Sequence, residues 1–186
     1  MLGTNARDRL RELLRRRAVM HGEFVLSSGQ RSSYYLDARL VTLSADGAAL
    51  VGETFLEALE GVAVDAVAGL TVGADPIVCA IAAVAGMQGR AIDGLIVRKE
   101  RKGHGAGRRI EGPWRDGMRV AVVDDTFTTG ASGLDAATAV REAGGRVEAV
   151  YALIDREEGA REAIEAAGYR FEAVFRAAEL VDIREP

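Results

Sequence analysis

Two adjacent carboxylates and a turn rich in hydroxyl groups stand out in the middle of the chain. The carboxylates are Asp124 and Asp125, which follow four apolar residues at 120–123 and precede a turn at 126–132. A short apolar run bounded by a turn is typical of a buried strand. The sequence therefore predicts that both acids lie where a strand ends, beside a turn that offers several hydrogen-bond donors.

The residues after the turn favour a helix that begins near Ala131. Leu134, Ala137 and Val140 recur at helical spacing. Backbone N–H groups and the positive end of the helix dipole would then face the turn, an arrangement that binds phosphate. The carboxylates could accept hydrogen bonds from sugar hydroxyls or hold a hydrated cation. A phosphate cradle beside a diol acceptor indicates a site for a ribose 5-phosphate.

Other interpretations of this segment are weaker. A strand that ends in Asp and leads through a glycine turn into a helix occurs in many α/β domains, but here two acids, several hydroxyl residues and Gly130 fall within nine positions. The chain has no Gly-x-x-x-x-Gly-Lys-Ser/Thr loop, which argues against a P-loop nucleotidase. It also has no Gly-x-Gly-x-x-Gly after an early strand, so a dinucleotide-binding fold is unsupported.

A second segment of strong chemical character covers residues 98–110. Of the twelve residues 98–109, six are Lys or Arg, three are Gly and one is His104. The segment has no apolar period, and its glycines allow large backbone changes. A cationic loop can close over phosphates, exclude water and stabilise the charge of a leaving group. We expect a flexible catalytic loop here, although such a segment can also be a solvated surface loop.

The elements that must position these residues form an α/β pattern. Helices are predicted at 5–19, 45–59, 76–85, 131–143 and 158–167, and strands at 24–26, 34–36, 63–69, 91–98, 120–123, 146–154 and 169–175. Strands that alternate with helices predict a mostly parallel sheet covered on both faces. Ligands of such sheets bind beyond the carboxyl ends of strands, which would place Thr71, Asp124 and Asp155 on one rim. We expect residues 1–60 to form an N-terminal hood with a linking helix, and residues 61–186 to form the core.

Composition limits the class of protein. The chain has 186 residues, of which 48% are hydrophobic, and its net charge is −4. This fits one domain with a small appended part and implies no general affinity for nucleic acid. The single cysteine, Cys79, excludes an intramolecular disulfide, and we expect it to be a small buried residue. No signal peptide or membrane span is apparent, so we expect a cytoplasmic enzyme.

Residues 120–132 resemble the diphosphate-sugar binding signature of the type I phosphoribosyltransferases. In that family the paired acids contact the ribose hydroxyls of phosphoribosyl diphosphate (PRPP), and the turn holds its 5-phosphate. The resemblance implies that Asp124 and Asp125 bind the ribose, with Asp125 among the catalytic residues. It implies PRPP contacts from the turn as well: Thr126, Thr128, Thr129, Gly130, Ala131 and Ser132.

The cationic segment limits the resemblance to one group within that family. Arg98-Lys99-x-x-Lys102-x-His104 is similar to the catalytic loop of the orotate phosphoribosyltransferases. In that family the loop acts on the pyrophosphate of PRPP and reaches into the neighbouring subunit. The resemblance implies a homodimer in which Lys102 and Arg98 stabilise the departing pyrophosphate with help from His104, while Lys99 contacts the diphosphate.

Three further segments resemble the same family. Residues 24–37 are similar to its N-terminal hairpin, whose paired aromatics, here Tyr34 and Tyr35, lie by the base. Residues 69–76 take the position of its pyrophosphate loop, which implies PRPP contacts at Thr71 and Gly73. Residues 155–159 resemble the segment whose Arg, here Arg156, grips the orotate carboxylate. A planar guanidinium suits this role because it pairs bidentately with a carboxylate. The resemblance implies an orotate contact from Thr128 too.

The resemblance as a whole implies a glycosyltransferase of pyrimidine (UMP) biosynthesis. It would convert orotate and PRPP to orotidine 5′-phosphate and pyrophosphate. PRPP would carry Mg²⁺, and no protein side chain would bind the ion directly. Asp124 and Asp125 would contact it only through water, if at all. Ser27 and Gly73 stand where many family members have lysine, so two cationic PRPP contacts are missing.

Two alternatives stay open at this point. The first is a phosphoribosyltransferase for adenine, a hypoxanthine-like base or uracil, against which the cationic loop and Arg156 argue. The second is a regulator that binds PRPP and controls transcription. Such a protein needs a surface for nucleic acid, and the one basic cluster of this chain is the loop.

Overall fold

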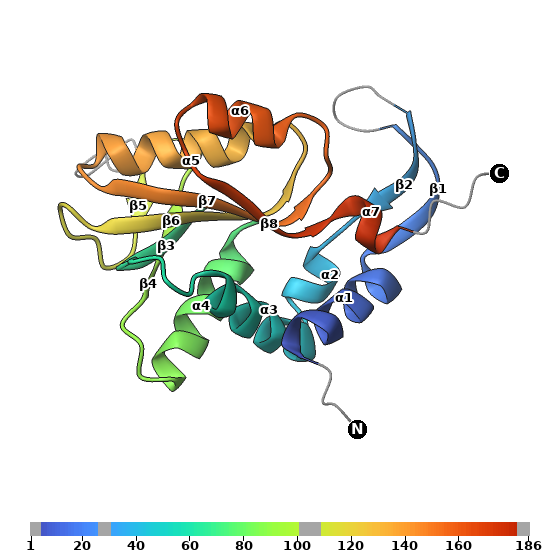
Figure 1. Cartoon of the computed structure of the whole chain (residues 1–186), viewed down its shortest axis with the longest axis horizontal. Helices are drawn as coiled ribbons and strands as arrows, with labels where there is room; N and C mark the ends of the chain where they lie inside the picture. The colour runs from blue at the N-terminus through green and yellow to red at the C-terminus, as the bar shows by residue number, and fades with distance from the viewer. Residues whose placement is uncertain (1–4, 26–30, 101–108, 182–186) are drawn as a thin grey trace.

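A six-stranded sheet forms the centre of the molecule (Figure 1). The computed structural model describes residues 5–25, 31–100 and 109–181. The strands follow the order β5-β4-β3-β6-β7-β8. The bounds are β3 Ala66–Leu70, β4 Asp93–Val97, β5 Ile110–Glu111, β6 Arg119–Phe127, β7 Arg146–Asp155 and β8 Phe171–Arg176. All neighbours pair in parallel except β4 and β5, which are antiparallel. The predicted fold class, a mostly parallel sheet with helices on both faces, is confirmed.

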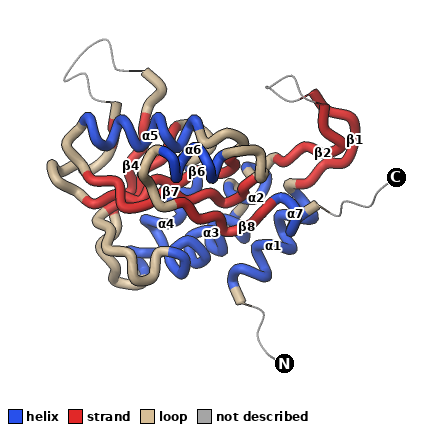
Figure 2. The backbone as a smooth tube through the Cα atoms, turned by 45° about the horizontal axis from the view of Figure 1, so that its top comes forward, coloured by secondary structure: helices blue, strands red, loops and turns tan. Residues whose placement is uncertain are grey.

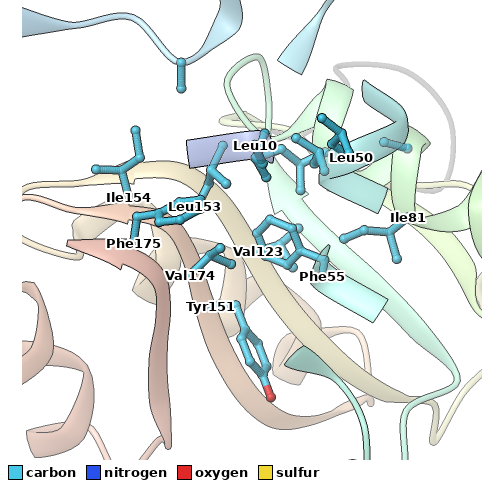
Figure 3. Packing of buried hydrophobic residues seen from close by; sticks show 14 of the residues in the cluster. Leu10, Leu50, Phe55, Ile81, Val123, Tyr151, Leu153, Ile154, Val174 and Phe175 are labelled. Carbon is cyan, nitrogen blue, oxygen red and sulfur yellow. The ribbon is translucent and has the colours of Figure 1, made fainter. Parts of the chain in front are cut away.

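Helices cover the two faces of this sheet (Figures 1 and 2). One face carries α3 (Ala45–Ala58) and α4 (Asp75–Met87), and the other carries α5 (Ala131–Glu142) and α6 (Ala160–Ala166). Because side chains alternate along a strand, neighbouring residues of β6 enter different cores. Val123 packs in the cluster under α3 and α4, shown in Figure 3, whereas Val122 packs in the cluster under α5 and α6. The rim of the sheet is thus held rigidly from both sides.

The N-terminal part consists of a helix, a hairpin and a short turn of helix. These are α1 (Ala6–Arg17), the antiparallel pair β1 (Val19–Val25) and β2 (Arg31–Leu36), and α2 (Arg39–Thr42). Asn5 caps α1, since its side chain accepts from the N–H of Asp8. Leu10 and Leu14 belong to the same buried cluster as Phe55. Arg7 donates to the carbonyl of Val174 (2.9 Å) and pairs with Glu179 (2.8 Å) in α7 (Ala177–Leu180), which ties this part to the end of the chain.

Several predicted boundaries are wrong; the strand expected over 24–26, for example, begins at Val19. The helix expected over 5–19 ends before Val19, because Val19 already pairs with Leu36 in the hairpin. The strand expected over 120–123 continues to Phe127, so the acid pair lies within the strand rather than at its end. The extension depends on the neighbouring strand, since Phe127 is in register with Asp155 of β7.

Other differences also arise from the tertiary structure. The short elements β5, α2 and α7 were not predicted, because each is only two to four residues long. Cys79 is exposed rather than buried, since α4 turns Ile77, Val78 and Ile81 toward the core instead. Within the described part of the chain, no helix is both long and apolar enough to cross a membrane.

Candidate active site

The acid pair lies in the second half of β6. Asp124 is 5% exposed, and its Oδ1 accepts from the N–H of Asp125 (2.9 Å). Asp125 Oδ1 accepts from the N–H of Thr126 (2.7 Å). Burial raises the pKa of Asp124 to about 7, and the charge of Asp125 adds to this increase, while a hydrogen bond from Ser132 opposes it. Burial also raises the pKa of Asp125. The pair is therefore poised to change protonation when a ligand supplies hydrogen-bond donors.

Gly73 lies directly against this pair. A Cβ atom at position 73 would be 2.8 Å from Asp125 Oδ1 and 3.0 Å from its Cγ. The missing side chain thus lets the loop between β3 and α4 approach the carboxylate. Any larger residue, including the lysine of many family members, would force Asp125 to move.

Arg39 is a charged neighbour of the pair that the sequence analysis missed. It forms a bidentate ion pair with Asp37 (2.8 and 3.1 Å) at the start of α2. Burial raises the pKa of Asp125, and the charge of Arg39 opposes this increase. The ion pair holds the pKa of Asp37 below its usual range. Since α2 packs against α4, Arg39 is carried to the rim by the N-terminal part of the chain. The signal for it was the Asp-x-Arg spacing directly after the tyrosine pair.

The helix after the predicted phosphate turn begins where it was expected, with α5 starting at Ala131. Gly130 adopts φ 77°, and a Cβ there would be 3.1 Å from Ile164, so the turn requires glycine. Gly133 packs so closely on the ring of Phe127 that a Cβ would lie 2.6 Å away. Among the residues that the structure describes, no side chain caps this end of α5. The first N–H groups of a helix have no partner within the helix, so they are available to an anion. Side chains of this turn differ in exposure: Thr126, Thr128 and Ser132 are half-buried, and Thr129 and Ala131 are exposed.

The base of the cationic loop borders a separate cleft of about 570 Å³, lined by Thr71, Val72, Ile96, Arg98, Lys99, Glu100 and Glu111. Thr71 donates to Asp75 (2.9 Å), which holds the loop after β3 in place. The two ends of the cationic loop are joined by the N–H of Arg98, which donates to the carbonyl of Arg109 (2.7 Å). Lys102 and His104 lie outside the described residues.

Arg109 ties the end of this loop to α5. Its guanidinium makes a bidentate pair with Asp135 of α5 (2.8 and 2.6 Å). Two parallel N–H···O bonds give such a pair a defined geometry. The base of the cationic loop is therefore fixed relative to the cradle.

Arg156 follows β7 and is 9% exposed. Its N–H donates to the carbonyl of Phe127 (2.9 Å), so it sits beside the end of β6. Its guanidinium lies over the ring of Tyr34, 5.1 Å from the ring centre, and its Nε donates to Glu158 (2.8 Å). Tyr35 points to the other face of the hairpin, where it packs on Phe24. The structure thus brings Tyr34 and Arg156 together and places Tyr35 apart from them.

Among residues 5–25, 31–100 and 109–181, no three His, Cys, Asp or Glu side chains form a group able to bind a metal ion. The oxygen donors of the acid pair suit a hard cation such as Mg²⁺, but two carboxylates leave most of its coordination to other ligands.

Comparisons with known proteins agree with one another. No family model matches the chain. The orotate phosphoribosyltransferase of Tropheryma whipplei is 47% identical over 166 residues, which cover 89% of this chain and 78% of that relative. The crystal structure of Mycobacterium tuberculosis orotate phosphoribosyltransferase in complex with Fe(III) dicitrate superposes with a TM-score of 0.84 at 46% identity, covering 94% of this chain and 98% of that one. A structure of the same enzyme in complex with PRPP gives a TM-score of 0.81 at 42% identity with equal coverage.

Sequence identity, coverage and fold therefore lead to one conclusion: the chain belongs to the orotate phosphoribosyltransferase family.

Proposed function

We propose that the chain transfers the ribose 5-phosphate group of PRPP to orotate, giving orotidine 5′-phosphate and pyrophosphate in pyrimidine biosynthesis. One observation carries this proposal: the acid pair, the uncapped start of α5 and Arg156 lie along the rim formed by β6 and β7. This rim offers carboxylates to a ribose, backbone N–H groups to a phosphate and a guanidinium to a carboxylate. The relatives of this chain bear the name of the same activity.

The ribose 5-phosphate is bound by the strand and helix that form the signature. Asp124 and Asp125 accept hydrogen bonds from the ribose hydroxyls. Backbone N–H groups at the start of α5 bind the 5-phosphate, together with the hydroxyls of Thr128, Thr129 and Ser132. Because β6 and α5 are packed into the core, the anomeric carbon is held in a defined place, and positioning of this kind contributes to the rate.

The pyrophosphate leaves toward the cleft between the loop after β3 and the base of the cationic loop. Arg98 and Lys99 line this cleft, and Lys102 and His104 follow in the cationic loop. Their charges stabilise the negative charge that develops on the departing pyrophosphate. At position 73 the backbone N–H takes the place of a lysine side chain, since glycine lets a phosphate approach the chain closely.

The orotate binds at the opposite end of the site. The guanidinium of Arg156 pairs with its carboxylate, and Thr128 and Tyr34 border the ring. Orotate carries an acidic ring N–H, so its nitrogen attacks the anomeric carbon without a strong protein base. An adenine or hypoxanthine ring has no carboxylate to pair with Arg156, which favours orotate over the other bases.

Magnesium is the expected cofactor. When bound, it would neutralise charge on the diphosphate of PRPP. Asp124 and Asp125 fit such a complex through water or through the ribose hydroxyls they hold. The chain itself supplies the pocket that orients PRPP, and this pocket keeps the two acids close to the sugar.

A homodimer in the cytoplasm is the expected state of the protein. Exposed apolar side chains on the hairpin, on α2 and on the loop after β3 support a covered surface near the site: Met20, Tyr35, Leu40, Leu43 and Val72. Leu43, which directly follows α2, is 70% exposed, and Val72 is 64% exposed, which is high for large apolar side chains. A partner covering this surface would also bring its own cationic loop near the cleft.

A base screen tests the proposed function. Consumption of orotate is followed by its ultraviolet absorbance with PRPP and Mg²⁺, and adenine, hypoxanthine and uracil serve as controls. We expect turnover with orotate alone. Turnover with another base instead would contradict the assignment of Arg156, and PRPP binding without any turnover would favour a regulator.

A further inference from the structure

Arg156 is held on three sides, although its role in binding requires one free edge. The backbone is fixed by Phe127, one face of the guanidinium is covered by Tyr34, and Nε is bound by Glu158 Oε1 at 2.8 Å. The Arg156 side chain is 6% exposed, whereas that of Glu158 is 29% exposed. An Arg with this much burial normally needs a paired anion, and Glu158 provides it.

The turn after β7 is built so that Glu158 folds back onto Arg156. Asp155 is buried, and its Oδ1 accepts from the N–H of Glu157 (2.9 Å). Glu157 adopts φ 61°, a left-handed conformation that a residue with a side chain rarely takes. Gly159 follows with φ 104° and starts α6. These two left-handed residues reverse the direction of the chain. The carboxylate of Glu158 therefore reaches back to the side chain of Arg156, two residues earlier.

The contact leaves the far edge of the guanidinium available. Glu158 takes Nε, and within the described part of the chain Nη1 and Nη2 have no hydrogen-bond partner. These two nitrogens form the end-on edge of the planar fork, which binds a carboxylate through two parallel hydrogen bonds. Tyr34 prevents the plane from tilting toward the hairpin. The orientation of this edge therefore depends on Glu158.

We propose that Glu158 is a positioning residue that aims the Nη1–Nη2 edge of Arg156 at the base site and so sets the selectivity for a base carrying a carboxylate. The inference rests on the proposed function, in which Arg156 binds orotate. In this proposal Glu158 acts by fixing the orientation of the Arg156 guanidinium, and its negative charge alone does not explain its role. A simple counter-charge would weaken the attraction between Arg156 and orotate, whereas a positioning contact strengthens binding.

Two substitutions separate geometry from charge. Glu158→Gln retains an oxygen that can accept from Nε but loses the negative charge. Glu158→Asp keeps the charge but is too short to reach Nε from the same backbone. Glu157→Gln is the matched control, because it removes the same charge from the adjacent exposed residue. KM for orotate, KM for PRPP and kcat are measured for each protein, and a thermal melt verifies folding.

The proposal predicts that Glu158→Asp raises KM for orotate by roughly tenfold or more, the effect of losing one hydrogen bond to a charged group. Glu158→Gln should stay within about threefold of the wild type, since one hydrogen-bond acceptor remains. KM for PRPP should change by less than about twofold in every variant, because the ribose and phosphate contacts are untouched. At a low orotate concentration the rate should fall in Glu158→Asp alone, while the rate with uracil stays at background in every variant.

Three outcomes would overturn the inference. If Glu158→Gln binds orotate more tightly than the wild type, Glu158 opposes the substrate by charge. If Glu158→Asp matches the Glu157→Gln control, the contact has no positioning role. In both cases the wild type still consumes orotate, so only the inference fails. If the wild type does not consume orotate at all, the proposed function and the inference fail together.

Discussion

The buried acid pair should make the unliganded protein less stable as the pH rises. The perturbation is Asp124→Asn, which mimics the protonated acid at all pH values. Asp124 has a pKa of about 7 in the folded chain, against 3.8 as its ordinary value, with burial as the main cause and the charge of Asp125 as the second. Between these two values the folded state binds more protons than the unfolded state. The free energy of unfolding therefore falls as the pH rises through this window and becomes level above it.

The magnitude follows from the width of the window. Each pH unit in which only the folded state holds the proton changes the free energy of unfolding by about 1.4 kcal/mol. From pH 5 to pH 7 this amounts to about 3 kcal/mol, lost by the wild type relative to Asp124→Asn. The two proteins should approach equal stability only below about pH 4, and the variant should be the more stable one at pH 5, by a margin that grows up to about pH 7 and is then constant. The Asp125 pKa is raised as well, so its titration adds to the loss in the wild type.

Urea denaturation at pH 5, 6, 7 and 8, without ligand, measures this difference. The midpoints and slopes of both proteins give their free energies of unfolding at each pH. Parallel pH profiles of the wild type and Asp124→Asn would refute the reasoning, and so would a wild type that gains stability over the variant toward pH 8. Either result would mean that Asp124 is ionised in the free protein and that hydrogen bonds offset the cost of burying its charge.

Three further predictions concern the substrate site. Gly73→Lys should raise KM for PRPP in steady-state kinetics, although it restores a cation, because its Cβ displaces Asp125; an unchanged or lower KM would show that the loop yields freely. Gly130→Ala should lower the free energy of unfolding by about 1 kcal/mol or more in denaturant titrations, because φ 77° strains an alanine. Lys102→Ala should reduce kcat far more than it weakens PRPP binding by calorimetry, and an equal loss of both would contradict a role in the transition state.

Local sequence patterns were enough to predict the mostly parallel sheet and the start of the helix after the acid pair. The start of α5 at Ala131 was predicted from apolar spacing that lies within one helix. The parallel sheet was predicted from the alternation of strands and helices, which is a property of the chain order. Arg156 and Tyr34 were expected to lie near each other only through the family resemblance, since they are 122 positions apart (156 − 34) and no local spacing relates them.

The details that depend on tertiary contacts could not be read in this way. The pairing of Phe127 with Asp155 lengthens β6, and no residue of β6 itself signals this. Cys79 lies in an apolar helix whose composition does not show which face meets the core. Tyr34 and Tyr35 are adjacent and chemically equal, so only the register of the hairpin decides which one faces Arg156. Arg39 and Glu158 reach the site through turns whose course depends on the packed structure.

The central claim is that the rim of β6 and β7 binds PRPP and orotate together and joins them. The most direct measurement is the formation of orotidine 5′-phosphate and pyrophosphate from both substrates with Mg²⁺, compared between the wild type and the double variant Asp125→Asn/Arg156→Gln. The account predicts one product of each kind per orotate consumed by the wild type, and a loss of nearly all turnover in a double variant that still folds. A wild type that forms no orotidine 5′-phosphate, or a folded double variant that keeps the full rate, would contradict it.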